Sequence, residues 1–185
     1  MGAEKTIKNQ GMEMNNKSVF LLIGQKGGGK SFIGKLFEKN FGIKFIRVED
    51  WAKRIKKERA VDNEEYLMQV FDEIEIGIRN CLKESDKLVF ESTGLTQYFD
   101  RMIQNLNQDF KVTTIGVYAD STTCLGRVKS RDQDIHINVS DDQVLMINEK
   151  VRQRNYKTDY LIINENKSET ELIKEVANIV GAIEM

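Results

Sequence analysis

The sequence predicts an α/β domain with three layers, α/β/α, built around a five-stranded parallel sheet. Five short apolar runs alternate with segments in which apolar residues recur every three or four positions. This alternation is typical of a parallel sheet with helices on both faces. A glycine-rich segment also lies between the first apolar run and the first helical segment, at the edge where such sheets bind ligands.

The apolar runs and the helical spacing give the elements in chain order. The first run, 18–23, ends at Gly24 and is typical of a strand buried on both faces. Ser168 and Glu171 form a capping box for the last helix. The predicted strands cover 18–23, 44–48, 87–91, 112–118 and 160–164. The predicted helices cover 31–40, about 50–60, about 67–82, 121–127 and the segment after 168.

Length and charge limit the kinds of partner. At 185 residues the chain suits one domain, which we expect over 18–185 after a leader or tag over 1–17. A net charge of −1 gives no overall field toward nucleic acid or an anionic membrane, so neither is an expected partner. No apolar run approaches the roughly 20 residues that span a bilayer. We predict a cytoplasmic protein that is a monomer or a homodimer.

The most informative motif is the loop after the first strand. Its sequence is Gly24-Gln25-Lys26-Gly27-Gly28-Gly29-Lys30-Ser31. Glycines let the backbone curl so that successive N–H groups point at phosphate oxygens, and the start of the next helix adds its own free N–H groups. Lys30 can reach the β- and γ-phosphates, and the Ser31 hydroxyl can hold Mg²⁺. The motif therefore predicts a P-loop that binds ATP and Mg²⁺.

Motors, GTPases and small kinases share this loop, so the rest of the chain must separate them. The chain is too short for a motor domain, and the Asn-Lys-x-Asp signal with which GTPases read their base is absent. From about Ser18 to its end the chain resembles the small P-loop kinases: shikimate and gluconate kinases, nucleoside monophosphate kinases, and the zeta-toxin and polynucleotide-kinase-like group. The matching segments are 24–31, 88–94, 124–131 and 152–164.

The resemblance implies a lid over about 129–141 whose arginines close over the transferring phosphoryl group. Arg127 and Arg131, four apart on a predicted helix, are the candidate catalytic arginines, and Arg127 is also expected to contact the nucleotide. A solvated basic helix end is the alternative. Helices over about 50–85 are expected to bind the phosphoryl acceptor, and Arg152 is a candidate ligand for it.

Acidic residues at strand ends are the other candidates. Glu91 follows the third strand, where a carboxylate can hold Mg²⁺ directly or through water, although the family usually has Asp or a small residue there. A salt-bridging or capping role is the alternative. Asp50 ends the second strand and either orients and deprotonates the phosphoryl acceptor, or caps a helix.

Three more residues are candidates for contact with the acceptor. Arg54 belongs to a basic run over 53–59, which either receives an anionic acceptor or is a solvated helix face. Thr93 and Gly94 leave backbone open to an acceptor after the third strand. The triple glycine and the Asp-x-Asp of shikimate kinases are missing here, which argues against shikimate itself.

The favoured function is an ATP-dependent kinase that moves the γ-phosphoryl group of Mg·ATP to a small-molecule or nucleotide acceptor. Two alternatives stay open: a nucleotide-binding module or weak ATPase without kinase activity, and a kinase of nucleic-acid 5′ ends. The basic run over 53–59 is the only local support for the last of these, and the balanced charge argues against it.

Overall fold

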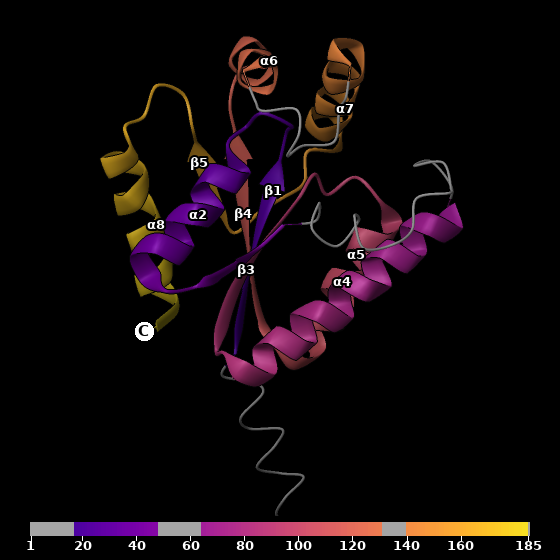
Figure 1. Ribbon diagram of the computed structural model, residues 1–185, viewed down its shortest axis with the longest axis vertical. Coiled ribbons are helices and arrows are strands. Elements are labelled where there is room, and N and C mark those ends of the chain that lie inside the picture. Colours follow the sequence, from indigo (N-terminus) through magenta and orange to yellow (C-terminus); the bar gives the residue numbers. More distant parts are fainter. Residues whose placement is uncertain (1–16, 48–63, 131–139, 185) are drawn as a thin grey trace, which may run out of the picture.

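The computed structural model describes residues 17–47, 64–130 and 140–184 (Figure 1). The strands are β1 (Ser18–Gly24), β2 (Lys44–Ile46), β3 (Lys87–Ser92), β4 (Lys111–Tyr118) and β5 (Tyr160–Ile163). The helices are α2 (Lys30–Phe41), α4 (Glu64–Glu84), α5 (Gln97–Asp109), α6 (Ser121–Lys129), α7 (Asp141–Arg154) and α8 (Glu169–Glu184). None of these helices is long and apolar enough to cross a membrane.

The strands form one parallel sheet in the order β2-β3-β1-β4-β5. Every residue of β1 is buried, as its continuous apolar run predicts, and β1 pairs with β3 on one side and β4 on the other. The predicted five-stranded parallel sheet is therefore confirmed. It brings the ends of β1 and β3, which are far apart in sequence, next to each other.

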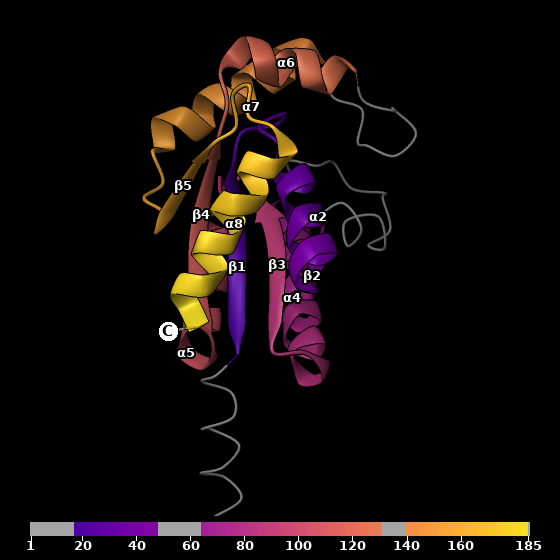
Figure 2. The ribbon, with the colours of Figure 1, turned by 90° about the vertical axis from the view of Figure 1, so that its left-hand side faces the viewer.

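Helices cover both faces of this sheet. Leu21 of β1 belongs to the apolar cluster formed with α4 and α5, whereas its neighbours Phe20 and Leu22 belong to the cluster formed with α2 and α8. This alternation follows from the two-residue period of a strand. Figure 2 shows α6 and α7 beyond the ends of the strands at the edge from which the phosphate-loop segment emerges, so these two helices cover that end of the sheet.

Where the structure describes the predicted elements, they differ from the prediction only at helix and strand ends, whereas α5 and α7 had no predicted bounds. The Ser168–Glu171 capping box is present: each backbone N–H donates to the other residue's side-chain oxygen. The second strand stops at Ile46, short of the predicted 48, and the predicted helix over 50–60 lies outside the described residues. Helix α6 ends at Lys129 with Ser130 as its C-cap, two residues beyond the predicted end at 127, and Arg131 lies outside the described residues.

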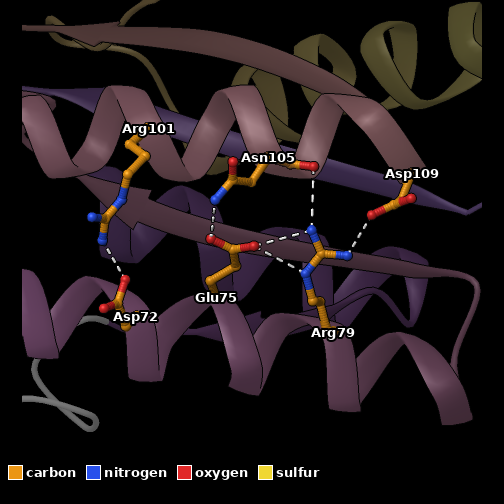
Figure 3. Close-up of polar contacts among 6 residues, drawn as sticks. All are labelled: Asp72, Glu75, Arg79, Arg101, Asn105 and Asp109. Carbon is orange, nitrogen blue, oxygen red and sulfur yellow. Dashed lines mark hydrogen bonds and ion pairs between the residues drawn. The ribbon is translucent and has the colours of Figure 1, made fainter.

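A polar network joins α4 to α5 along their exposed sides (Figure 3). The Arg79 guanidinium donates to Glu75 Oε1 at 3.0 Å, to Asp109 Oδ2 at 2.6 Å and to the Asn105 carbonyl at 3.2 Å. It also lies 5.4 Å from the centroid of the Phe110 ring. Burial works to lower the pKa of Arg79, but the hydrogen bonds that it donates to Asp109 and Glu75 outweigh burial and raise that pKa. The network therefore fixes α5 against α4.

We expect Arg79→Ala to lower the free energy of unfolding by about 1–2 kcal/mol, because it removes two half-exposed ion pairs and an aromatic contact at once. The control is Lys83→Ala, one turn further along α4, where the exposed ammonium donates to Asn80 Oδ1 at 2.8 Å. This variant should change stability by less than about 0.5 kcal/mol. Urea denaturation measures both, and equal effects would show that the network contributes nothing of its own.

Candidate functional site

The phosphate-loop segment leaves β1 and enters α2 through glycines in the left-handed region. Gly27 has φ 81° and Gly29 has φ 101°. A Cβ atom on Gly27 would lie 2.1 Å from the Cys124 carbonyl oxygen of α6, and one on Gly29 would lie 2.0 Å from Asn164 Nδ2. Backbone conformation therefore favours glycine at both positions, and at Gly27 the close approach of the α6 backbone excludes a side chain as well.

Lys30 begins α2 with its side chain turned back along the loop. Its ammonium donates to the Gly24 carbonyl at 2.9 Å and to the Gln25 carbonyl at 2.8 Å, and the residue is only 8% exposed. Gln25 is itself buried against the end of β4, where its Oε1 accepts from the Ala119 N–H at 3.5 Å. The loop thus encloses the lysine that its sequence motif singles out.

Ser31 and Glu91 meet at the ends of two neighbouring elements. The Ser31 hydroxyl lies 2.8 Å and 2.9 Å from the two carboxylate oxygens of Glu91, and Glu91 is 8% exposed on β3. Both predicted metal-binding residues are therefore in one place. They offer the hard oxygen atoms that Mg²⁺ prefers, with few protein ligands, which suits an ion that keeps water and phosphate oxygens in its shell. No cluster of three or more metal-binding side chains occurs in the described part of the chain.

Arg127 lies beside the loop, where the sequence analysis expects a nucleotide contact. Its Nη2 donates to the Asn164 carbonyl at 3.0 Å, and its Nη1 lies 3.5 Å from the Gly28 carbonyl. Helix α6 is held by its N-cap, Asp120, and hydrogen bonds from Thr123 hold the pKa of that carboxyl below its ordinary value. Helix α6 thus places Arg127 against the loop, between the carbonyls of Gly28 and Asn164.

The other side of the site lies after β3. Gly94 has φ 72°, and a Cβ atom there would lie 2.9 Å from Ile23 Cγ2, while Thr93 beside it is half-buried. Arg154, at the end of α7, donates to the Gly94 carbonyl. It also donates to both carboxylate oxygens of Asp100, at 2.6 Å each. One arginine of α7 therefore holds the loop at Gly94, where the sequence analysis predicts contact with the phosphoryl acceptor.

Sequence reasoning selected Arg152 for this region rather than Arg154. Arg152 is exposed and pairs with Glu149 on the same helix, while the Arg154 guanidinium lies 5.4 Å from the centroid of the Tyr156 ring. Burial, followed by repulsion from Asp100, raises the pKa of the Tyr156 hydroxyl. The spacing along α7 alone does not show which arginine turns toward Gly94. Asp50, Arg54 and Arg131, together with most of the predicted lid, lie outside the described residues.

Comparison with solved structures identifies the architecture. A gluconokinase from Sinorhizobium meliloti superposes with a TM-score of 0.66 at 15% identity, over 92% of this chain and 95% of that one. Shikimate kinase from Aquifex aeolicus gives a TM-score of 0.58 at 20% identity, over 89% and 96% of the two chains. The fold is that of the small P-loop kinases.

This P-loop kinase fold extends to an APS kinase from Mycobacterium tuberculosis in complex with AMPPNP and APS. That structure superposes with a TM-score of 0.61 at 12% identity, over 90% of this chain and 99% of the other. No protein-family model and no curated protein matches the sequence. At these identities the likeness establishes the fold, and the predicted resemblance to the P-loop kinases is confirmed at that level.

Proposed function

We propose that this chain is an ATP-dependent phosphotransferase, which moves the γ-phosphoryl group of Mg·ATP to a small-molecule or nucleotide acceptor. The observation that carries the proposal is that Lys30, enclosed by the glycine loop, lies next to the Ser31–Glu91 pair. Both lie at the edge of the sheet where β1 and β3 end. Its support from outside the chain is that the structural neighbours include gluconate, shikimate and APS kinases.

In this proposal the loop binds the polyphosphate of ATP. Backbone N–H groups of the loop and of the first turn of α2 donate to phosphate oxygens, aided by the positive end of the helix dipole. Lys30 exchanges the carbonyls of Gly24 and Gln25 for the β- and γ-phosphates, so that its charge follows the phosphate that moves. Arg127, already next to Gly28, adds a cation on the same side.

Ser31 and Glu91 would hold Mg²⁺, Ser31 through its hydroxyl and Glu91 directly or through water. When bound, the ion neutralises charge that builds up on the phosphate oxygens. Glu91 sits on a central strand and is almost fully buried, so its carboxylate is fixed before the ion arrives. The sheet therefore positions Glu91, and the first turn of α2 positions Ser31.

The phosphoryl acceptor would lie against Thr93 and Gly94. Its hydroxyl oxygen forms a bond to the γ-phosphorus, the bond between that phosphorus and the β,γ-bridging oxygen breaks, and ADP leaves. The proton of the hydroxyl passes to a base, for which Asp50 remains the candidate from the sequence. The role of Arg131 in stabilising charge on the transferred phosphoryl group likewise remains a prediction. So does contact of Arg54 and Arg152 with the acceptor.

Glu91→Gln tests the metal site, because the amide keeps a hydrogen-bond acceptor for Ser31 and removes the charge. We expect the Mg²⁺ concentration for half-maximal activity to rise by about tenfold or more, as for other residues that hold or orient a metal. The exposed Glu84→Gln is the matched control and should leave it unchanged. An unchanged Mg²⁺ requirement in Glu91→Gln would remove Glu91 from the metal site.

The function itself is tested by incubating the protein with Mg·ATP labelled on the γ-phosphate and a pooled library of metabolites, nucleotides and 5′-hydroxyl oligonucleotides. The proposal predicts transfer of label to a small acceptor, which chromatography then identifies. Label on an oligonucleotide would instead identify a nucleic-acid kinase. ATP binding without transfer to any acceptor would favour a nucleotide-binding module and would overturn the proposal.

A further inference from the structure

Helix α7 buries two side chains, Val144 and Asn148, and the second of these is polar. Asn148 is 2% exposed. A buried amide without partners costs free energy, so an apolar residue would be expected at this position unless the amide makes specific bonds. The partners of Asn148 are in the phosphate-loop segment, 122 positions earlier in the chain.

The Asn148 side chain forms a paired contact with the backbone of Lys26. Its Oδ1 accepts from the Lys26 N–H at 2.7 Å, and its Nδ2 donates to the Lys26 carbonyl at 2.9 Å. Both bonds have good hydrogen-bond lengths, and together they fix the orientation of the peptide units on both sides of Lys26. The contact joins the loop to the helix that also carries Arg154 to Gly94.

Because a peptide unit is planar, this contact also sets the direction of the Gly27 N–H. The Lys26 carbonyl and the Gly27 N–H belong to the same trans peptide unit and therefore point in opposite directions. With the carbonyl held toward Asn148, the Gly27 N–H is directed away from α7. Asn164 orients a second peptide unit, two residues further along the loop. Its Nδ2 donates to the Gly28 carbonyl at 3.0 Å, and this contact directs the Gly29 N–H away from Asn164.

Neither of these two N–H groups makes a hydrogen bond to another described residue. They belong to the glycines whose left-handed conformation makes the loop curl. We infer that Asn148 and Asn164 are positioning residues, which aim the Gly27 and Gly29 amides at the phosphates of the bound nucleotide. This inference rests on the proposed function as far as the ligand is concerned, and it adds that α7 is part of the nucleotide site.

The test compares two substitutions on the same face of α7. Asn148→Ala removes both bonds to Lys26, and Val144→Ala, one turn earlier, removes buried apolar side-chain atoms but no side-chain hydrogen bond to the loop. Calorimetry with Mg·ATP and with inorganic tripolyphosphate should show Kd raised about tenfold in Asn148→Ala, the equivalent of one or two lost hydrogen bonds. Val144→Ala should bind within about twofold of the unaltered protein even though urea denaturation shows it to be less stable.

Asn148→Leu serves as a second variant, because it keeps a branched side chain of similar shape and loses the same bonds. In kinase assays both Asn148 variants should raise KM for ATP with little change in kcat, since loop amides bind the phosphates in the ground state and the transition state alike. Equal weakening by Val144→Ala, or unchanged Kd and KM in both Asn148 variants, would overturn the inference.

Amide NMR gives a readout for each site separately. Binding of tripolyphosphate should shift the Gly27 and Gly29 amide resonances of the unaltered protein, and Asn148→Ala should reduce the Gly27 shift while leaving that of Gly29. If the unaltered protein binds Mg·ATP but transfers no phosphoryl group, the proposed function fails and this inference stands. If phosphoryl transfer is normal and the Gly27 shift is unchanged in Asn148→Ala, the proposed function stands and this inference fails.

Discussion

Lys30→Ala is expected to lower kcat/KM for Mg·ATP by about 10²–10³-fold, the scale observed when one preorganised group that stabilises transition-state charge is removed. The ammonium is enclosed by the loop, and in the proposed function it binds the β- and γ-phosphates. Steady-state kinetics with varied ATP measures the effect.

Two further variants make the Lys30 prediction specific. Lys30→Met keeps an unbranched side chain of similar length without the charge and should show a loss of the same order. Lys35→Ala removes a lysine from the exposed side of the same helix and should leave kcat/KM unchanged. Activity within about threefold of normal in Lys30→Met would exclude a role for the ammonium in the reaction.

Gly27→Ala is expected to raise Kd for Mg·ATP by about 100-fold or more and to lower the free energy of unfolding by about 2–3 kcal/mol. Alanine is strained at φ 81°, and its Cβ would lie 2.1 Å from the backbone carbonyl oxygen of Cys124. Backbone cannot rotate out of the way as a flexible side chain can. Relief therefore requires the loop and α6 to separate, which moves the amides proposed to bind phosphate. Calorimetry and urea denaturation measure the two effects.

Gly126→Ala is the matched control for this prediction. Gly126 lies inside α6, and a Cβ atom there meets no atom within 4 Å. The substitution should therefore stabilise the helix by up to about 1 kcal/mol and leave ATP binding unchanged. Normal ATP binding by Gly27→Ala would mean that the close approach of loop to α6 is unnecessary for the site.

Much of the fold could be predicted because local pattern and global arrangement agree. The all-apolar β1 can only be a strand covered on both faces, and strands alternating with helices can pair in parallel only through crossovers. Ends of elements were less predictable. Helix α6 ends at Lys129, two residues after the predicted end, and no glycine or proline marks that position in the sequence.

Some residues of the site could likewise be predicted from the sequence, and others could not. The meeting of Ser31 and Glu91 follows from the motif at the end of β1 and from the pairing of β1 with β3. The sequence predicts the motif and the strands but not the order of the strands in the sheet. Asn148 and Arg154 could not be found, because their partners are 122 and 60 positions away and depend on how α7 is rotated about its axis. Among the polar residues that cover most of α7, nothing in the sequence distinguishes the two that turn inward.

Calorimetric titration of the full chain with ATP in the presence of Mg²⁺ tests the central claim, a loop that binds a triphosphate, most directly. The structure predicts one site per chain, with binding that is lost when AMP replaces ATP and strongly weakened in Gly27→Ala. Heat that is absent with ATP and with every other purine triphosphate, in protein whose fold is intact by circular dichroism, would contradict it.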